Sequence, residues 1–247
     1  MKDKNIFIEG LPGAVKSTLF NQMWREDRDL KVFREGDLSP VELIWCSYMD
    51  EENWQQTLNM FPELETQIRA KSMQEGNYYI TAYTLVLADR RDFYEHMEKY
   101  EIYNGRVTYQ RFKEIILKRY EAFTDHGCVF ESSLFQYAVT TMILFYEMSD
   151  EEILEFYKEV FAILKEKQMQ LIYLDVEDVR ENLLRIRKER SDYMGNEMWY
   201  PLMLNYLKES PYGKANHCED FEDLVTYFQR RRDLEKRIIN ELSVPQV

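Results

Sequence analysis

The chain has 247 residues, of which 45% are hydrophobic and 15% are aromatic. This composition is typical of a globular protein with a sizeable core and excludes a disordered chain. The net charge of −13 opposes nucleic-acid binding, because a protein that neutralises many phosphates needs a basic face. No segment is long and apolar enough to predict a membrane span. We therefore expect neither nucleic acid nor a membrane as a partner.

Three widely spaced cysteines, Cys46, Cys128 and Cys218, favour reduced thiols over a disulfide framework. The N-terminal stretch lacks the apolar run of a signal peptide, so we expect a cytoplasmic protein. No linker, low-complexity run or internal repeat interrupts the chain, which predicts a single domain over 1–247.

The first half of the chain begins with a short buried strand over 4–9, predicted by the consecutive apolar residues Ile6, Phe7 and Ile8. A helix over 16–25 and a second strand over 30–34 follow. Ser39-Pro40 has the cap and first-turn residues of a helix start, so we expect a helix there. Helices are also expected over 50–60 and 62–74. The apolar run over 78–88 is compatible with a strand or a buried helix.

In the second half, Thr108 is expected to cap a helix, and a third strand is expected over 127–130. A helix over 134–145 follows. Ser149 and Glu152 have capping-box spacing and predict another helix start. A fourth strand over 171–175, a basic helix over 179–190, and helices over 197–208 and 221–242 complete the chain. The arginines at 230–232, in the last helix, are expected to be solvated. This alternation predicts a parallel sheet with helices on both faces.

The stretch Gly10-Leu11-Pro12-Gly13-Ala14-Val15-Lys16-Ser17 lies between the first strand and the first helix. A glycine-rich turn in this context directs backbone N–H groups at an anion, which the helix dipole also favours. The stretch resembles the Walker A motif of the P-loop kinases, in which the lysine reaches the phosphates and the next hydroxyl ligates magnesium. The resemblance implies ATP and Mg²⁺ as cofactors, Ser17 as the metal ligand and Lys16 as a catalytic residue. The nucleotide-binding residues that it implies in this stretch are Gly10, Gly13, Ala14, Val15, Lys16, Ser17 and Thr18.

Val15 departs from the motif, which has glycine at this position. Valine disfavours the positive φ that glycine adopts without strain. Three outcomes are open: the loop keeps its shape with the valine turned away and binds ATP less tightly; the loop is deformed and does not bind; or the valine is a substitution in an active parent protein.

Two further segments resemble thymidylate and deoxynucleoside kinases. Residues 33–37, FREGD, are similar to the segment after the second strand, which implies that Glu35 or Asp37 accepts a proton or helps to hold magnesium. We name Asp37 as the catalytic candidate. Residues 129–136 are similar to the third-strand segment and place Glu131 at its catalytic acid. Ser132 stands where the arginine of the usual acid–arginine pair is expected.

The one dense basic run of this acidic chain, over 180–190, resembles the lid of nucleoside and nucleotide kinases. A lid brings arginines over the phosphates, where their planar guanidinium groups bind oxygens in pairs. The resemblance implies a lid over 180–195, with Arg187 as a catalytic residue and Arg185 and Arg190 as nucleotide contacts. The alternative is a surface helix with internal ion pairs, since Glu181 and Arg185 are four residues apart.

Together these resemblances imply an α/β, P-loop NTPase-like three-layer sandwich of four or five parallel strands with helices on both faces. A helix-rich insertion over 40–125 would bind the acceptor. Residues 244–247 are too few, with a proline among them, to predict the family's last strand. The implied function is ATP-dependent phosphoryl transfer to a small molecule: a nucleoside, a nucleotide or a similar cyclic compound. The alternative is a non-catalytic, degenerate nucleotide-binding protein with a regulatory role. A homodimer is left open.

Overall fold

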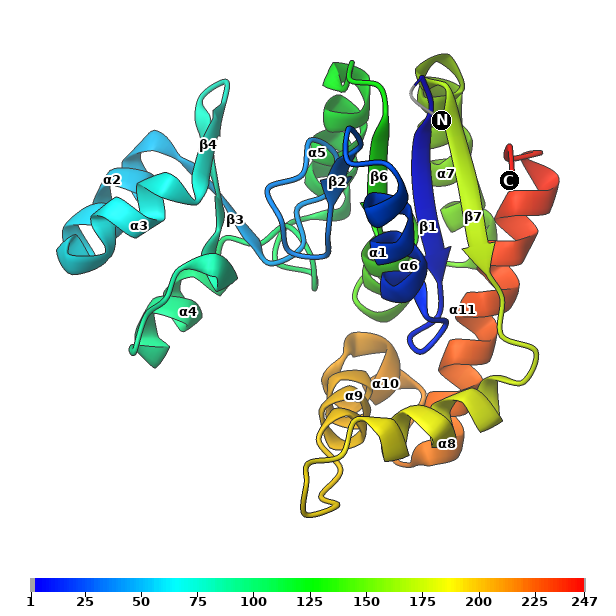
Figure 1. Ribbon diagram of the computed structural model, residues 1–247. Coiled ribbons are helices and arrows are strands. Elements are labelled where there is room, and N and C mark those ends of the chain that lie inside the picture. The colour runs from blue at the N-terminus through cyan, green and yellow to red at the C-terminus, as the bar shows by residue number, and fades with distance from the viewer. Residues whose placement is uncertain (1–2, 247) are drawn as a thin grey trace. The chain divides into compact units, whose positions relative to one another are not determined.

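The computed structural model describes residues 3–246, which form two compact units. The first unit combines the chain up to Val32 with everything from Thr124 onward, and the second is Phe33–Phe123. Figure 1 labels most of their helices and strands. The insertion expected over 40–125 lies almost wholly in the second unit. The sequence predicts a single domain over 1–247, and the described residues of this span form the two units. Residues 1, 2 and 247 lie outside the described part.

A four-stranded parallel sheet forms the centre of the first unit, which confirms the predicted α/β class. Its strands are β1 (Asn5–Gly10), β2 (Lys31–Phe33), β6 (Cys128–Glu131) and β7 (Met169–Leu174), in the order β2-β6-β1-β7. β1 is central and pairs in parallel with both β6 and β7. All six residues of β1 are buried, as expected for a parallel strand covered on both faces.

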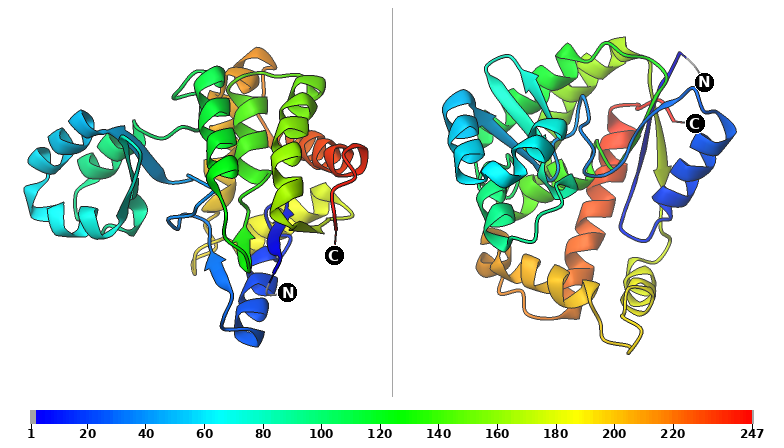
Figure 2. Two further views of the ribbon diagram at one scale, coloured as in Figure 1. Left: turned by 90° about the horizontal axis from the view of Figure 1, so that it is seen from above. Right: turned by 60° about the vertical axis from the view of Figure 1, so that its left-hand side comes forward.

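Helices cover the two faces of this sheet, which makes three layers. Ile6 and Ile8 of β1 pack against Phe20 and Met23 of α1 (Lys16–Glu26). The opposite face is covered by α6 (Gln136–Leu144), α7 (Asp150–Leu164) and α11 (Phe221–Glu241), which lie together on one side of the sheet in Figure 2. The described helices also include α8 (Val179–Glu189), α9 (Trp199–Glu209) and α10 (Pro211–Ala215). None of the helices between residues 3 and 246 is long and apolar enough to cross a membrane.

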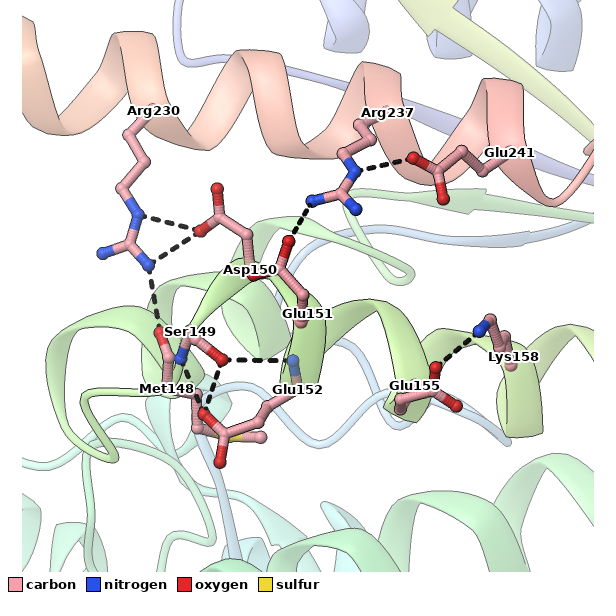
Figure 3. A network of polar contacts seen from close by, with 10 residues as sticks. All are labelled: Met148, Ser149, Asp150, Glu151, Glu152, Glu155, Lys158, Arg230, Arg237 and Glu241. Atoms are coloured by element: carbon pink, nitrogen blue, oxygen red, sulfur yellow. Dashed lines mark hydrogen bonds and ion pairs between the residues drawn. The ribbon is translucent and has the colours of Figure 1, made fainter.

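The helix α7 begins where the capping box was predicted. The Ser149 hydroxyl accepts a hydrogen bond from the backbone N–H of Glu152, and the Glu152 carboxylate accepts one from the backbone N–H of Ser149. Figure 3 shows two arginines of α11 beside the same first turn. Arg230 donates to Asp150 and to the Met148 carbonyl, and Arg237 pairs with Glu151 at 3.0 Å. These contacts join α11 to the start of α7.

The end of the described chain lies beside β7. The backbone N–H of Leu171 donates to the Pro245 carbonyl over 2.8 Å, and Leu171 and Gln246 form an isolated parallel bridge. Residues 244–246, which the sequence did not suffice to assign to a strand, thus contribute one isolated bridge beside β7, and Val247 lies outside the described residues.

The second unit contains an antiparallel sheet of three strands, β3 (Cys46–Asp50), β4 (Ser72–Glu75) and β5 (Tyr78–Ala82), in the order β3-β5-β4. Its helices are α2 (Glu51–Met60), α3 (Glu65–Ala70), α4 (Arg91–Glu98) and α5 (Tyr109–Ala122). An apolar cluster that includes Met49, Trp54, Phe61 and Phe93 fills the space between α2, α4 and one face of this sheet. Thr108 caps α5, as predicted, by accepting a hydrogen bond from the backbone N–H of Arg111.

Three predictions in the second unit are changed by the structure. The helix expected at Ser39 is wrong, because residues 38–44 are not helical. There the Ser39 hydroxyl accepts from Val41 and Glu42, and the Glu42 carboxylate accepts from Leu43 and Ile44, so local side-chain bonds replace a helical ladder. The helix expected over 62–74 ends at Ala70, and the last residues of that range, 72–74, belong to β4. The ambiguous run over 78–88 is β5 followed by a 3₁₀ turn, Tyr83–Leu85.

The expectation that the arginines at 230–232 are solvated is also wrong. Arg231 is buried and forms an ion pair with the equally buried Glu235 at 2.7 Å. Arg230 bonds to Asp150, and Arg232 donates to the Val176 and Glu177 carbonyls. Consecutive residues of a helix point in different directions, and of these three arginines Arg231 faces the core.

The cap of α7 yields a prediction about stability. Ser149→Ala removes the acceptor for the backbone N–H of Glu152 and is expected to lower the free energy of unfolding by about 1 kcal/mol, measured by urea denaturation. Ser243→Ala is the control, because Ser243 is exposed and lies outside the helices. Equal effects of the two substitutions would contradict a capping role.

Candidate functional site

The loop between β1 and α1 makes a tight turn at the carboxyl edge of the sheet. Gly10 and Gly13 have φ values of 140° and 81°. A Cβ on Gly10 would lie 2.4 Å from the Leu174 carbonyl oxygen, and one on Gly13 would lie 2.6 Å from Ile186 Cδ1. Neither position has room for a side chain, so the turn depends on both glycines.

Val15 adopts the left-handed conformation, with φ 53° and ψ 28°, directly before α1. Its side chain is 60% exposed, and its carbonyl accepts from the backbone N–H groups of Thr18 and Leu19. The valine is therefore turned away into solvent and still starts the helix, which is the geometry of the first of the three outcomes. A left-handed β-branched residue costs about 1–2 kcal/mol of strain.

The Lys16 ammonium lies over the loop that precedes it. Its Nζ donates to the Gly10 carbonyl at 2.9 Å and to the Leu11 carbonyl at 3.1 Å, and the residue is 8% exposed. These bonds keep a positive charge at the inner side of the turn, next to the N-terminus of α1. The first-turn amides of a helix have no intrahelical partners, and the helix dipole adds positive potential there.

Ala14 and Thr18 are two other loop residues that the motif predicts. The backbone N–H of Ala14 donates to the Leu11 carbonyl at 3.2 Å, which closes the turn. Thr18 lies in the first turn of α1 with an exposed side chain.

The Ser17 hydroxyl donates a hydrogen bond to Glu131 Oε1. Ser17 comes from the first turn of α1 and Glu131 from the end of β6, so the parallel pairing of β1 and β6 brings them together. A hydroxyl and a carboxylate are hard oxygen ligands of the kind that Mg²⁺ prefers. Between residues 3 and 246 there is no cluster of three or more His, Cys, Asp or Glu side chains suited to a metal ion. Mg²⁺ in phosphate sites needs no such cluster, because waters and phosphate oxygens complete its shell.

The first half of α8 packs onto the same loop. Asn182 donates to the Pro12 carbonyl at 2.9 Å, and Arg185 donates to the Gly13 carbonyl at 2.8 Å and to Asn182 Oδ1 at 2.7 Å. The structure thus brings Arg185, one of the predicted lid arginines, to the loop.

The other two lid arginines contact different partners. Arg187 binds both carboxylate oxygens of Glu197, at 2.9 and 3.0 Å, and its guanidinium lies 3.9 Å from the centre of the Tyr200 ring. Arg190 lies over the Trp199 ring at 5.8 Å. Residues two apart on a helix point to different sides, so Arg185 and Arg187 cannot both face the loop. The catalytic role of Arg187 and the nucleotide contact of Arg190 stay predictions.

Asp37 belongs to the second unit. Its carboxylate accepts from the backbone N–H of Arg34 at 2.8 Å, and its own N–H donates to the Arg34 carbonyl at 3.0 Å. These bonds close the turn after β2. A catalytic role for Asp37 also stays a prediction.

Glu9 was not among the predicted site residues. It is fully buried, its Oε1 accepts from the backbone N–H of Leu134 at 2.6 Å, and its Oε2 is buried without a hydrogen-bond partner. Burial raises the pKa of the carboxyl from 4.5 to about 7; the hydrogen bond from Leu134 opposes the rise, Glu235 adds to it, and the charge of Lys16 opposes it to a lesser extent. The sequence carries a signal for it, a single acid at the end of an apolar strand directly before the loop.

A buried polar network continues behind Glu9 on the face covered by α6 and α11. Tyr173, the β7 partner of Glu9 in the strand register, donates to Glu235 at 2.9 Å. Arg231 donates to the other oxygen of Glu235 at 2.7 Å. Tyr227 donates to the Thr140 hydroxyl at 2.9 Å. Charged groups thus lie in the core behind the β1–α1 loop.

The assembled site can hold a polyanion at the turn and a divalent cation beside it. The lysine, the helix N-terminus and Arg185 supply positive charge, and the Ser17–Glu131 pair supplies oxygen ligands. Neither the models of known protein families nor the curated proteins include a match to this chain.

Proposed function

We propose that the protein binds ATP with Mg²⁺ at the β1–α1 loop and transfers its terminal phosphoryl group to a small molecule. The observation that carries the proposal is the contact of Ser17 with Glu131, directly beside a glycine-dependent turn that holds Lys16. An anion-binding turn and a pair of metal ligands in contact are the parts that phosphoryl transfer from a nucleotide requires.

Each residue has a definite role in this proposal. Loop amides and the Lys16 ammonium bind the β- and γ-phosphates, and Gly10 and Gly13 allow the tight turn that presents these amides. Arg185 adds a guanidinium that can leave the Gly13 carbonyl for a phosphate oxygen. Mg²⁺ held by Ser17 and Glu131 would neutralise charge on the phosphates.

The acceptor in this proposal is a nucleoside, a nucleotide or a similar cyclic compound with a hydroxyl or phosphate group. The second unit is the helix-rich insertion that the sequence predicts as the acceptor-binding part. Asp37 stays the predicted acceptor base.

A second function, nucleotide binding without catalysis, is favoured by two observations. Val15 strains the loop, and Ser132 replaces the arginine of the acid–arginine pair. Ser132 itself has φ 58° and a buried hydroxyl without a hydrogen-bond partner. An ADP-formation screen over nucleosides and nucleotides distinguishes the two functions, because only a catalyst consumes ATP faster when an acceptor is present.

Binding is tested first by thermal melting. Mg–ATP at 100 times its dissociation constant is expected to stabilise the folded state by about 2.7 kcal/mol and so to raise the melting temperature. Lys16→Ala, which removes the loop cation, is expected to abolish the shift. An unchanged melting temperature of the wild type at millimolar Mg–ATP would sink the proposal.

The substitution Val15→Gly is expected to strengthen ATP binding, because glycine has no β-carbon and lets the backbone approach the phosphates. The left-handed strain of about 1–2 kcal/mol is already present in the free loop, so its relief is expected to raise the free energy of unfolding. Isothermal titration calorimetry measures the change in affinity. Gln168→Gly is the matched control: Gln168 also has a positive φ, 51°, but it lies before the first residue of β7, at the other edge of the sheet. Equal affinities of wild type and Val15→Gly would show that the valine does not limit binding.

The metal ligands are tested as a pair. Ser17→Ala and Glu131→Gln are each expected to remove most of the Mg²⁺ dependence of ATP binding and to leave metal-free binding within a few-fold of the wild type. If both residues ligate one ion, the double variant loses little more than either single variant. Additive losses, or an unchanged Mg²⁺ dependence, would count against a shared metal site.

A further inference from the structure

One face of α8 contacts the β1–α1 loop through three residues. Asn182, Arg185 and Ile186 are three and four residues apart, so they lie on the same side of the helix. Asn182 and Arg185 donate to the carbonyls of Pro12 and Gly13, two consecutive loop residues. Ile186 packs so closely on Gly13 that a Cβ there would lie 2.6 Å from its Cδ1. This face of α8 therefore adjoins the proposed phosphate-binding loop.

Asn182 uses both ends of its side-chain amide in this contact. Its Nδ2 donates to the Pro12 carbonyl at 2.9 Å, and its Oδ1 accepts from Arg185 at 2.7 Å. The residue is 6% exposed and lies inside α8, between the buried Val179 and Ile186. Asparagine is a weaker helix former than leucine, and a buried amide is costly unless it is hydrogen-bonded. The two bonds compensate for that cost.

These two bonds have different consequences. The bond from Nδ2 satisfies a loop carbonyl, which is a structural role. That role needs no acceptor on the same side chain, yet Oδ1 binds Arg185, which is the member of the three predicted lid arginines that contacts the loop. The bond to Oδ1 therefore fixes where the guanidinium lies.

Arg185 is held at the loop through one nitrogen. Its Nη2 donates both to the Gly13 carbonyl at 2.8 Å and to Asn182 Oδ1 at 2.7 Å. Its Nη1 lies 3.7 Å from Glu189, in a solvent-exposed ion pair of the kind that contributes little. A guanidinium has five N–H groups, so Nε or Nη1 can bind a phosphate oxygen while Nη2 keeps its bond to Asn182.

We propose that Asn182 is the positioning residue for Arg185: its amide, anchored on the Pro12 carbonyl, keeps the guanidinium at the loop when the guanidinium exchanges the Gly13 carbonyl for a phosphate oxygen. The inference rests on the proposed function. Ordering a long arginine side chain costs entropy, and a bond to a buried amide reduces the freedom that is lost when the phosphate binds. Asn182 itself touches no phosphate in this arrangement.

The test is a double-mutant cycle on Mg–ATP affinity, measured by isothermal titration calorimetry of the full chain. Asn182→Ala and Arg185→Ala are each expected to weaken binding by about tenfold, as the loss of one charge-assisted hydrogen bond does. The double variant is expected to lose little more than Arg185→Ala alone, because the asparagine acts through the arginine. Independent effects would instead multiply to about a hundredfold.

Ile186→Val is the matched control from the same face of α8. It removes one methylene from the contact with Gly13 and leaves the bonds of Asn182 and Arg185 in place. Any effect on affinity is therefore expected to multiply with that of Arg185→Ala. Equal coupling in the two cycles would show that Asn182 only supports the packing of α8, and it would overturn the proposal.

Free guanidinium ion gives a readout that packing alone does not change. At millimolar concentration it is expected to restore part of the Mg–ATP affinity of Arg185→Ala, because it can take the place of the missing side-chain group beside Asn182 Oδ1. It is expected to restore none in the double variant, which lacks this acceptor. Asn182→Ser, whose hydroxyl can bond to a carbonyl of its own helix, takes the place of Asn182→Ala if the alanine variant does not fold.

Each outcome decides between the proposals. Multiplied losses, an affinity unchanged in either single variant, or equal responses of Arg185→Ala and the double variant to guanidinium overturn the role of Asn182 and leave ATP binding standing. Failure of the wild type to bind Mg–ATP overturns both proposals.

Discussion

The close approach of the backbone at the end of β1 is the constraint on which the first unit depends. The chain turns so tightly at Gly10 and Gly13 that the Leu174 carbonyl and the Ile186 side chain occupy the places where side chains would lie. That approach lets three elements meet at one loop: α1 through its N-terminus, β7 through its last carbonyl and α8 through Asn182 and Arg185. Lys16 closes the arrangement by bonding to the carbonyls of the turn itself.

The elements of the first unit could be predicted from sequence because local signals and burial agree there. An apolar run followed by glycines predicts β1, and the serine–glutamate spacing at 149–152 predicts the start of α7. In the second unit the local sequence signals and the burial of the residues disagree. Ser39 and Glu42 bond to nearby backbone instead of opening a helix, and this competition cannot be judged from a cap pattern alone.

Some residues of the candidate site could likewise be predicted from the sequence, and others could not. Lys16, Ser17 and Glu131 could be named from the motif and from the edge where parallel strands end. Arg185 could be named as well, but which arginine of α8 reaches the loop depends on the packing of Ile186 against Gly13. The buried acids and Arg231 were missed because charged residues are ordinarily read as surface residues. Arg231 nevertheless occurs at helical spacing between Tyr227 and Leu234, both of which are buried, and this spacing was a usable signal.

The segment after α11 affects how the molecule can associate. β7 is an edge strand, and open strand edges are templates for sheet extension between chains. Here Pro245 and Gln246 lie along that edge, and the proline accepts from Leu171 but has no N–H with which to continue a ladder. Pro245 and Gln246 therefore occupy the part of the β7 edge beside Leu171, where a strand from another chain would otherwise pair.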